Sequence, residues 1–161
     1  MKWKLNHSLT TGISFGITSA VVTTLGLMIG LGTSTESKII VLGGILSIAF
    51  ADAFSDAMGI HVSEESELKH TKREIWESTI ATFISKLAFA LTFAIPILLF
   101  SLGTAILIAV VWGLLLMSIY SIRLAKKEKI KPYRVVAEHI GIIILVIIVT
   151  YFIGTWIRTL G

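Results

Sequence analysis

Long apolar runs constrain the fold of this chain more than any other feature. They cover roughly residues 10–32, 38–61, 79–122 and 137–158. A helix needs roughly 20 mostly apolar residues to cross the hydrocarbon core of a bilayer. The third run is about twice that length and contains Ser101, Gly103 and Thr104, which suit a tight turn between two helices. The sequence therefore predicts five membrane-spanning helices, at about 10–32, 38–61, 79–101, 102–123 and 137–158.

The composition also favours an all-α membrane protein with a single transmembrane domain. The chain is 55% hydrophobic and 15% charged, with a mean hydropathy of +0.89, whereas soluble domains carry more charge. The first run is too long for the apolar core of a secretory signal and has no cleavage-like site after it. We therefore expect it to remain as the first span. The chain has no cysteine, which excludes disulfides and thiolate metal ligands.

Lysine and arginine are distributed unequally between the loops that would lie on opposite sides of the membrane. With a cytoplasmic N-terminus, only Lys38 and Arg158 fall outside. Eleven basic residues fall inside: Lys2, Lys4, Lys69, Lys72, Arg73, Arg123, Lys126, Lys127, Lys129, Lys131 and Arg134. The positive-inside rule then predicts a multi-pass protein, expected in the cell membrane, with its N-terminus inside and its C-terminus outside.

The same topology places segments 62–78 and 124–136 in the cytoplasm. It accounts for the basic net charge of +4 without a nucleic-acid partner. The basic residues between Lys126 and Arg134 also lie where anionic lipid head groups would contact them.

Three ionisable residues lie in the interior of the expected spans, away from their ends: Asp52, Asp56 and Lys86. The two aspartates are four residues apart, so they share one helix face, and an antiparallel second helix would bring Lys86 to a similar depth. One interpretation is a salt bridge that only fixes helix packing. The other is a functional site, because two acids facing one base leave a carboxylate over, and carboxylate oxygens suit a divalent cation.

Small and hydroxyl-bearing residues recur along the first two spans. Gly12, Gly16 and Ala20 repeat every four residues, which lets helix backbones approach closely in lipid. Hydroxyls such as those of Thr18 and Ser19 would either face the transport path or bond to their own helix. Met58 would add a thioether contact to the path or simply pack against a neighbouring helix.

The segment 62–78 has no glycine or proline and is predicted to form a cytoplasmic helix. One face would carry five potential metal ligands: Glu64, Glu67, His70, Glu74 and Glu77. The Glu67–His70 spacing is that of carboxylate-bridged metal sites in helical bundles, so this face is a candidate collector of metal ions. The alternative is a solvated helix with ion pairs such as Arg73–Glu77.

Two segments resemble the vacuolar iron transporter family. They are residues 16–31 (GITSAVVTTLGLMIGL) and 51–63 (ADAFSDAMGIHVS), and the end of the last span (YFIG, residues 151–154) is similar as well. Ser19, Asp56 and Ile60 stand where the family has aspartate, methionine and glutamate, and the cytoplasmic region is shortened. The chain resembles a divergent, shortened member of that family.

The resemblance implies a homodimer that exports Fe²⁺ or Mn²⁺ from the cytosol in exchange for protons. The metal ion is then cargo, and no permanently bound cofactor is expected. The alternatives are a non-transporting membrane scaffold and a carrier of another cation, in which an aspartate and Lys86 simply pair. An enzyme is not expected, since no loop presents a nucleophile elbow or a phosphate-binding loop.

Overall fold

The computed structural model describes residues 7–160, and every regular element within that range is a helix. The elements in chain order are α1 (His7–Thr35), α2 (Lys38–Ser66), α3 (Lys72–Thr92), α4 (Ala94–Leu99), α5 (Leu102–Glu128) and α6 (Pro132–Arg158). Helices α3 and α4 together make one span, Lys72–Leu99. The structure thus has five helical segments long and apolar enough to cross a membrane, which confirms the predicted fold class.

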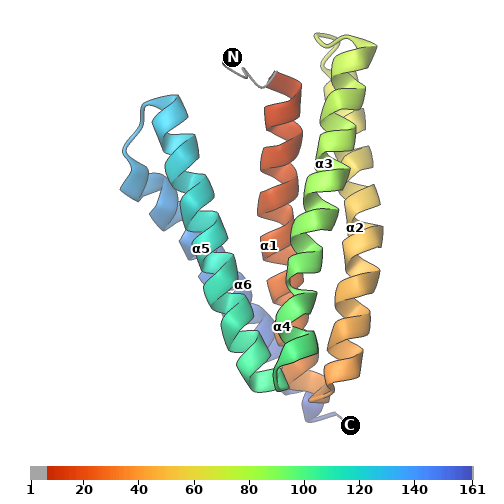
Figure 1. The fold of residues 1–161 in the computed structure, drawn as a ribbon, viewed down its shortest axis with the longest axis vertical. Helices are drawn as coiled ribbons and strands as arrows, with labels where there is room; N and C mark the ends of the chain where they lie inside the picture. Colours follow the sequence, from red (N-terminus) through yellow and green to blue (C-terminus); the bar gives the residue numbers. More distant parts are fainter. Residues whose placement is uncertain (1–6, 161) are drawn as a thin grey trace.

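Helix α1 occupies the centre of the bundle (Figure 1). It packs against α2 and α3 on one side and against α5 and α6 on the other. The last two helices lean away from α1 toward the end where the chain begins, so the bundle is wider at that end (Figure 1). In the most apolar 18-residue stretch of α1, 50% of the residues are buried, against 11% in the corresponding stretch of α6.

The ladder of small residues on α1 brings it against α3, as the sequence predicted. A Cβ added at Gly12 would lie 2.8 Å from the Ala81 Cβ, and one at Gly16 would lie 2.8 Å from the Thr82 carbonyl oxygen. Real side chains do not approach so closely. Only glycine, whose side chain is a hydrogen atom, permits this packing. Close approach of backbones is one way in which helices associate in lipid, where no hydrophobic effect drives them together.

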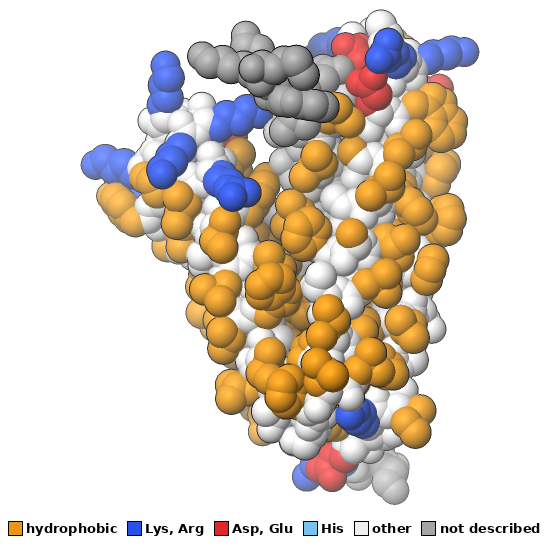
Figure 2. Space-filling model, viewed as in Figure 1, with side chains coloured by type: hydrophobic (Ala, Val, Ile, Leu, Met, Phe, Trp, Pro, Cys, Tyr) orange, Lys and Arg blue, Asp and Glu red, His pale blue; other side chains and the backbone are white. Residues whose placement is uncertain are grey.

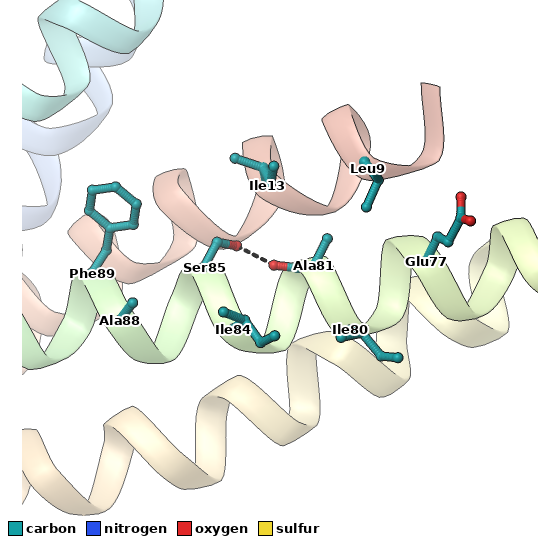
Figure 3. A pocket seen from close by; sticks show the side chains of 9 residues that line it. All are labelled: Leu9, Ile13, Glu77, Ile80, Ala81, Ile84, Ser85, Ala88 and Phe89. Atoms are coloured by element: carbon teal, nitrogen blue, oxygen red, sulfur yellow. Dashed lines mark hydrogen bonds between the residues drawn. The ribbon is translucent and has the colours of Figure 1, made fainter. Parts of the chain in front are cut away.

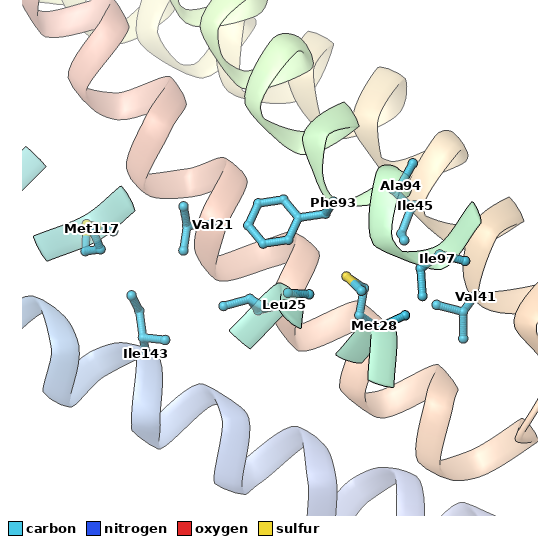
Figure 4. Close-up of a cluster of buried hydrophobic side chains, with 12 residues drawn as sticks. Val21, Leu25, Met28, Val41, Ile45, Phe93, Ala94, Ile97, Met117 and Ile143 are labelled. Atoms are coloured by element: carbon cyan, nitrogen blue, oxygen red, sulfur yellow. The ribbon is translucent and has the colours of Figure 1, made fainter. Parts of the chain in front are cut away.

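Proline interrupts the third span. Pro96 has no N–H and its ring clashes with the carbonyl four residues earlier, that of Thr92. The helix breaks at Phe93 accordingly. The Phe93 side chain is fully buried in an apolar cluster with Val21, Leu25 and residues of the other spans (Figure 4).

The segment 62–78 differs from the single cytoplasmic helix predicted for it. Helix α2 continues to Ser66, Leu68 takes a left-handed conformation with φ of 55°, and α3 begins after Thr71. Thr71 and Glu74 form a capping box, in which the threonine side chain accepts from the Glu74 N–H and the glutamate accepts from the Thr71 N–H. This box starts a new helix, so the segment is divided between the ends of two spans.

On the face that Figure 2 shows, charged side chains gather at the two ends of the bundle, and the surface between them is largely apolar. We call the end with the α2–α3 and α5–α6 turns the basic end. At the opposite end, Arg158 pairs with Glu36, and the Lys38 ammonium donates to the Leu98 carbonyl at 3.2 Å. Lys2 and Lys4, which the orientation argument also uses, lie outside the described residues.

Candidate ion-binding site within the bundle

Lys86 lies at the middle of the third span and is 1% exposed. Its ammonium group forms ion pairs with both Asp52 and Asp56 of α2. It also donates to the Ser19 hydroxyl of α1 at 2.7 Å. Three helices thus meet at one cation, and we call these four residues the Lys86 cluster.

Both α2 and α3 extend beyond their predicted spans at the basic end, and Asp52 lies at the midpoint of Lys38–Ser66. Asp52 and Asp56 are one turn apart and present both carboxylates to the same neighbour. On α3, Thr82 lies one turn before Lys86 and Ser85 directly precedes it, and both carry buried hydroxyls.

Two carboxylates and one ammonium group give the cluster a net charge of minus one. Both carboxylates are partly exposed: the side chain of Asp52 is 25% exposed and that of Asp56 is 17% exposed. The Asp52 Oδ2 atom lies against Lys86 but has no aligned hydrogen bond among the described residues. A surplus carboxylate at mid-membrane depth is costly unless a proton or another cation joins it.

The other residues predicted for the path lie elsewhere. The Thr18 hydroxyl donates to the Ser14 carbonyl at 3.0 Å, and its side chain lines a cavity facing α5 and α6. Met58 is 57% exposed on the outer surface of α2. Of the predicted path residues, the structure brings together Asp52, Asp56, Lys86 and Ser19, and it separates Thr18 and Met58 from them.

The acidic residues proposed as a metal collector are also divided. Glu64 is buried and accepts from the Ser78 hydroxyl at 2.8 Å. Glu74 belongs to the capping box, and Glu77 accepts from Arg73 at 2.8 Å. Glu67 and His70 remain close, at 3.7 Å. Within residues 7–160, no three histidine, aspartate or glutamate side chains are arranged to hold a metal ion.

One helix α1 hydroxyl near the core differs from the others in its hydrogen bonding. Thr24 is fully buried, and its hydroxyl has no partner among the residues that the structure describes. Helix hydroxyls normally donate to the carbonyl one turn earlier, as Thr23 does to Ser19 at 2.9 Å. No sequence pattern distinguishes Thr23 from Thr24. Their difference comes from tertiary burial, which keeps water from the Thr24 hydroxyl.

Fold and site together define a multi-pass helical membrane protein with a charged cluster at the centre of its bundle. No model of a known protein family matches the chain, and no curated protein matches it either. The similarity to vacuolar iron transporters therefore rests on the short segments in the first two spans and the last one.

Proposed function

We propose that this protein is a proton-coupled transporter of a divalent transition metal, Fe²⁺ or Mn²⁺, with the Lys86 cluster as its ion-exchange site. The observation that carries the proposal is the pairing of one buried lysine with two carboxylates at mid-membrane depth. Ionisable groups there usually serve ion pathways or proton relays. The expected direction is export from the cytosol.

The charges suggest how metal and proton would be coupled. A divalent cation that binds between Asp52 and Asp56 repels the Lys86 ammonium, which lies against the same oxygens. Lysine can lose its proton, and a neutral amine beside two carboxylates and a divalent ion leaves the site uncharged. Metal binding at the cluster would then release one proton, and metal release would take one up.

A second copy of the chain would complete the coordination shell, since two carboxylates satisfy only part of a metal ion's requirement. The outer face of α2 carries an exposed row of small residues, namely Gly43, Ser47, Ala51, Ser55 and Gly59. A Cβ added at Gly43 or Gly59 would meet nothing within 4 Å in residues 7–160. Ser55 lies about 60° around the helix from Asp52. A homodimer packed through this row would bring both pairs of carboxylates near the interface.

The test uses purified protein in liposomes, with Mn²⁺ or Fe²⁺ outside and fluorescent reporters of metal and of pH inside. Wild-type protein should admit metal while protons move the other way, and Asp56→Asn should abolish both fluxes. Glu36→Gln is the matched control, because it removes a carboxylate at the opposite end that pairs only with an exposed arginine. Absence of flux with both metals in the wild type would refute the proposal.

The second candidate is a scaffold in which Lys86 only ties three helices together, and its contact with Ser19 favours that role. Lys86→Arg separates the two. Arginine keeps the positive charge but cannot release a proton, so it should satisfy a structural ion pair and yet stop proton-coupled transport. A folded Lys86→Arg protein with normal proton-coupled metal flux would contradict the exchange mechanism.

A further inference from the structure

A cavity opens between α1 and α5 at the basic end, and its largely apolar lining includes basic and hydroxyl groups. It consists of two adjoining parts of about 210 and 390 Å³, which share Thr10, Ser14, Tyr120 and Lys127 among their lining residues. Arg123 lines the smaller part, one helical turn from Lys127. Glu128 lines the larger part, but the two α5 cations leave the lining with a positive balance.

His139 of α6 lines the larger part, and its ring is held in one orientation. The buried Ser121 hydroxyl donates to the Met117 carbonyl at 2.6 Å and lies 2.8 Å from the His139 Nδ1 atom. This contact uses Nδ1 and leaves Nε2 as the second polar group of the ring.

An apolar groove runs along the other side of α1, between α1 and α3. It measures about 560 Å³ and is lined by residues such as Leu9, Ile80, Ile84 and Phe89, with Glu77 at its end nearest the basic end (Figure 3). Ile13 lines both this groove and the smaller part of the basic cavity. The cationic cavity and the apolar groove therefore adjoin on the surface of α1.

We propose that this composite surface binds an anionic phospholipid. The phosphate group would lie at Arg123 and Lys127, with the Ser14 hydroxyl as a further donor, and an acyl chain would lie past Ile13 in the apolar groove. Basic pockets between spans at the cytoplasmic side are suited to lipid head groups. A soluble phosphate would use the cations but would leave the adjoining groove unfilled.

Native mass spectrometry of the detergent-purified full chain tests the proposal, with phosphatidylglycerol, phosphatidylcholine and soluble glycerol 3-phosphate as probes. Phosphatidylglycerol should bind most tightly. Arg123→Gln with Lys127→Gln should weaken its binding roughly tenfold or more. The matched control is Lys126→Gln with Lys129→Gln, which removes the same charge from neighbouring positions that do not line the cavity. The control should bind as the wild type does.

The outcomes separate the sources of affinity. Equal losses in both double variants would mean that general surface charge attracts the lipid, and the site would be refuted. Glycerol 3-phosphate binding as tightly as phosphatidylglycerol would refute the lipid assignment. Ala88→Trp gives a second readout, because Ala88 lines the groove but not the basic cavity. Filling the groove there should weaken binding of phosphatidylglycerol but not of glycerol 3-phosphate. Circular dichroism of each variant shows that it has kept its helices.

Discussion

The Lys86 ammonium of α3 donates a hydrogen bond to the Ser19 hydroxyl of α1 at 2.7 Å. The contact joins the central helix to a lysine already held by two carboxylates of α2. The cluster therefore stabilises the packing of three helices and also concentrates charge near the middle of the second and third spans. These two consequences can be measured separately.

We predict that loss of both carboxylates destabilises the protein far more than loss of either one. Asp52→Asn with Asp56→Asn leaves the buried Lys86 ammonium without a counter-ion, which costs roughly 3–5 kcal/mol. Each single variant keeps one ion pair and should lose much less. Unfolding in detergent, followed by circular dichroism, measures the difference. Additive small losses would show that the ammonium group reaches water.

We predict that Gly16→Ala disrupts the contact of α1 with α3. The new methyl group would lie 2.8 Å from the Thr82 carbonyl oxygen and 2.9 Å from the Lys86 backbone nitrogen, and overpacking of this kind costs roughly 1–3 kcal/mol. Gly141→Ala is the control, since a Cβ there meets nothing within 4 Å in the described part of the chain. It should leave the free energy of unfolding unchanged or raise it by up to about 1 kcal/mol, because alanine has a higher helix propensity than glycine. Equal stabilities would contradict the close packing.

We predict that a cysteine at Ser55 cross-links two copies of the chain. The native sequence has no cysteine, so each introduced thiol reports on one position alone. Oxidation of Ser55→Cys in membranes should give a dimer that reductant reverses, because the exposed small-residue row on α2 would bring this position near its symmetry mate. Gly141→Cys, on the exposed face of α6, should remain monomeric on denaturing gels. Cross-linking at residue 141 but not at residue 55 would show that the interface lies on α6 and not on α2.

We predict that Glu67→Ala with His70→Ala lowers metal affinity without abolishing flux. These two residues remain within 3.7 Å of each other at the basic end, whereas Glu64, Glu74 and Glu77 have partners within the bundle or its caps. Calorimetric titration with Mn²⁺ measures the affinity, and the liposome assay measures the flux. Glu65→Ala is the control, because Glu65 is exposed nearby. An unchanged calorimetric affinity would exclude a collecting role for the pair.

The sequence was sufficient to predict the number and approximate position of the spans. Hydrocarbon thickness fixes the length of an apolar helix, so runs of hydrophobic residues report spans directly. The four-residue spacing of Asp52 and Asp56 likewise fixed their common face. The capping box at Thr71 and Glu74 is a local pattern too, but the absence of glycine and proline around it favoured one continuous helix, and that prediction was too simple.

Tertiary structure decided which polar residues meet. Thr18 and Ser19 are neighbours in the sequence and both were placed on the path, yet about 100° of helical rotation turns Ser19 toward Lys86 and Thr18 toward α5 and α6. Helix periodicity determines that they face different ways. Only the packing of α1 against α3 through Gly12 and Gly16 determines which of them faces the charged cluster.

The sequence alone therefore determined that two acids and a base lie within helices long and apolar enough to cross a membrane. The tertiary structure determined that both acids share one base and that one carboxylate oxygen of Asp52 lacks an aligned donor among the described residues. The physical reason is that charge and hydropathy are properties of single residues, whereas neutralisation depends on distances between helices.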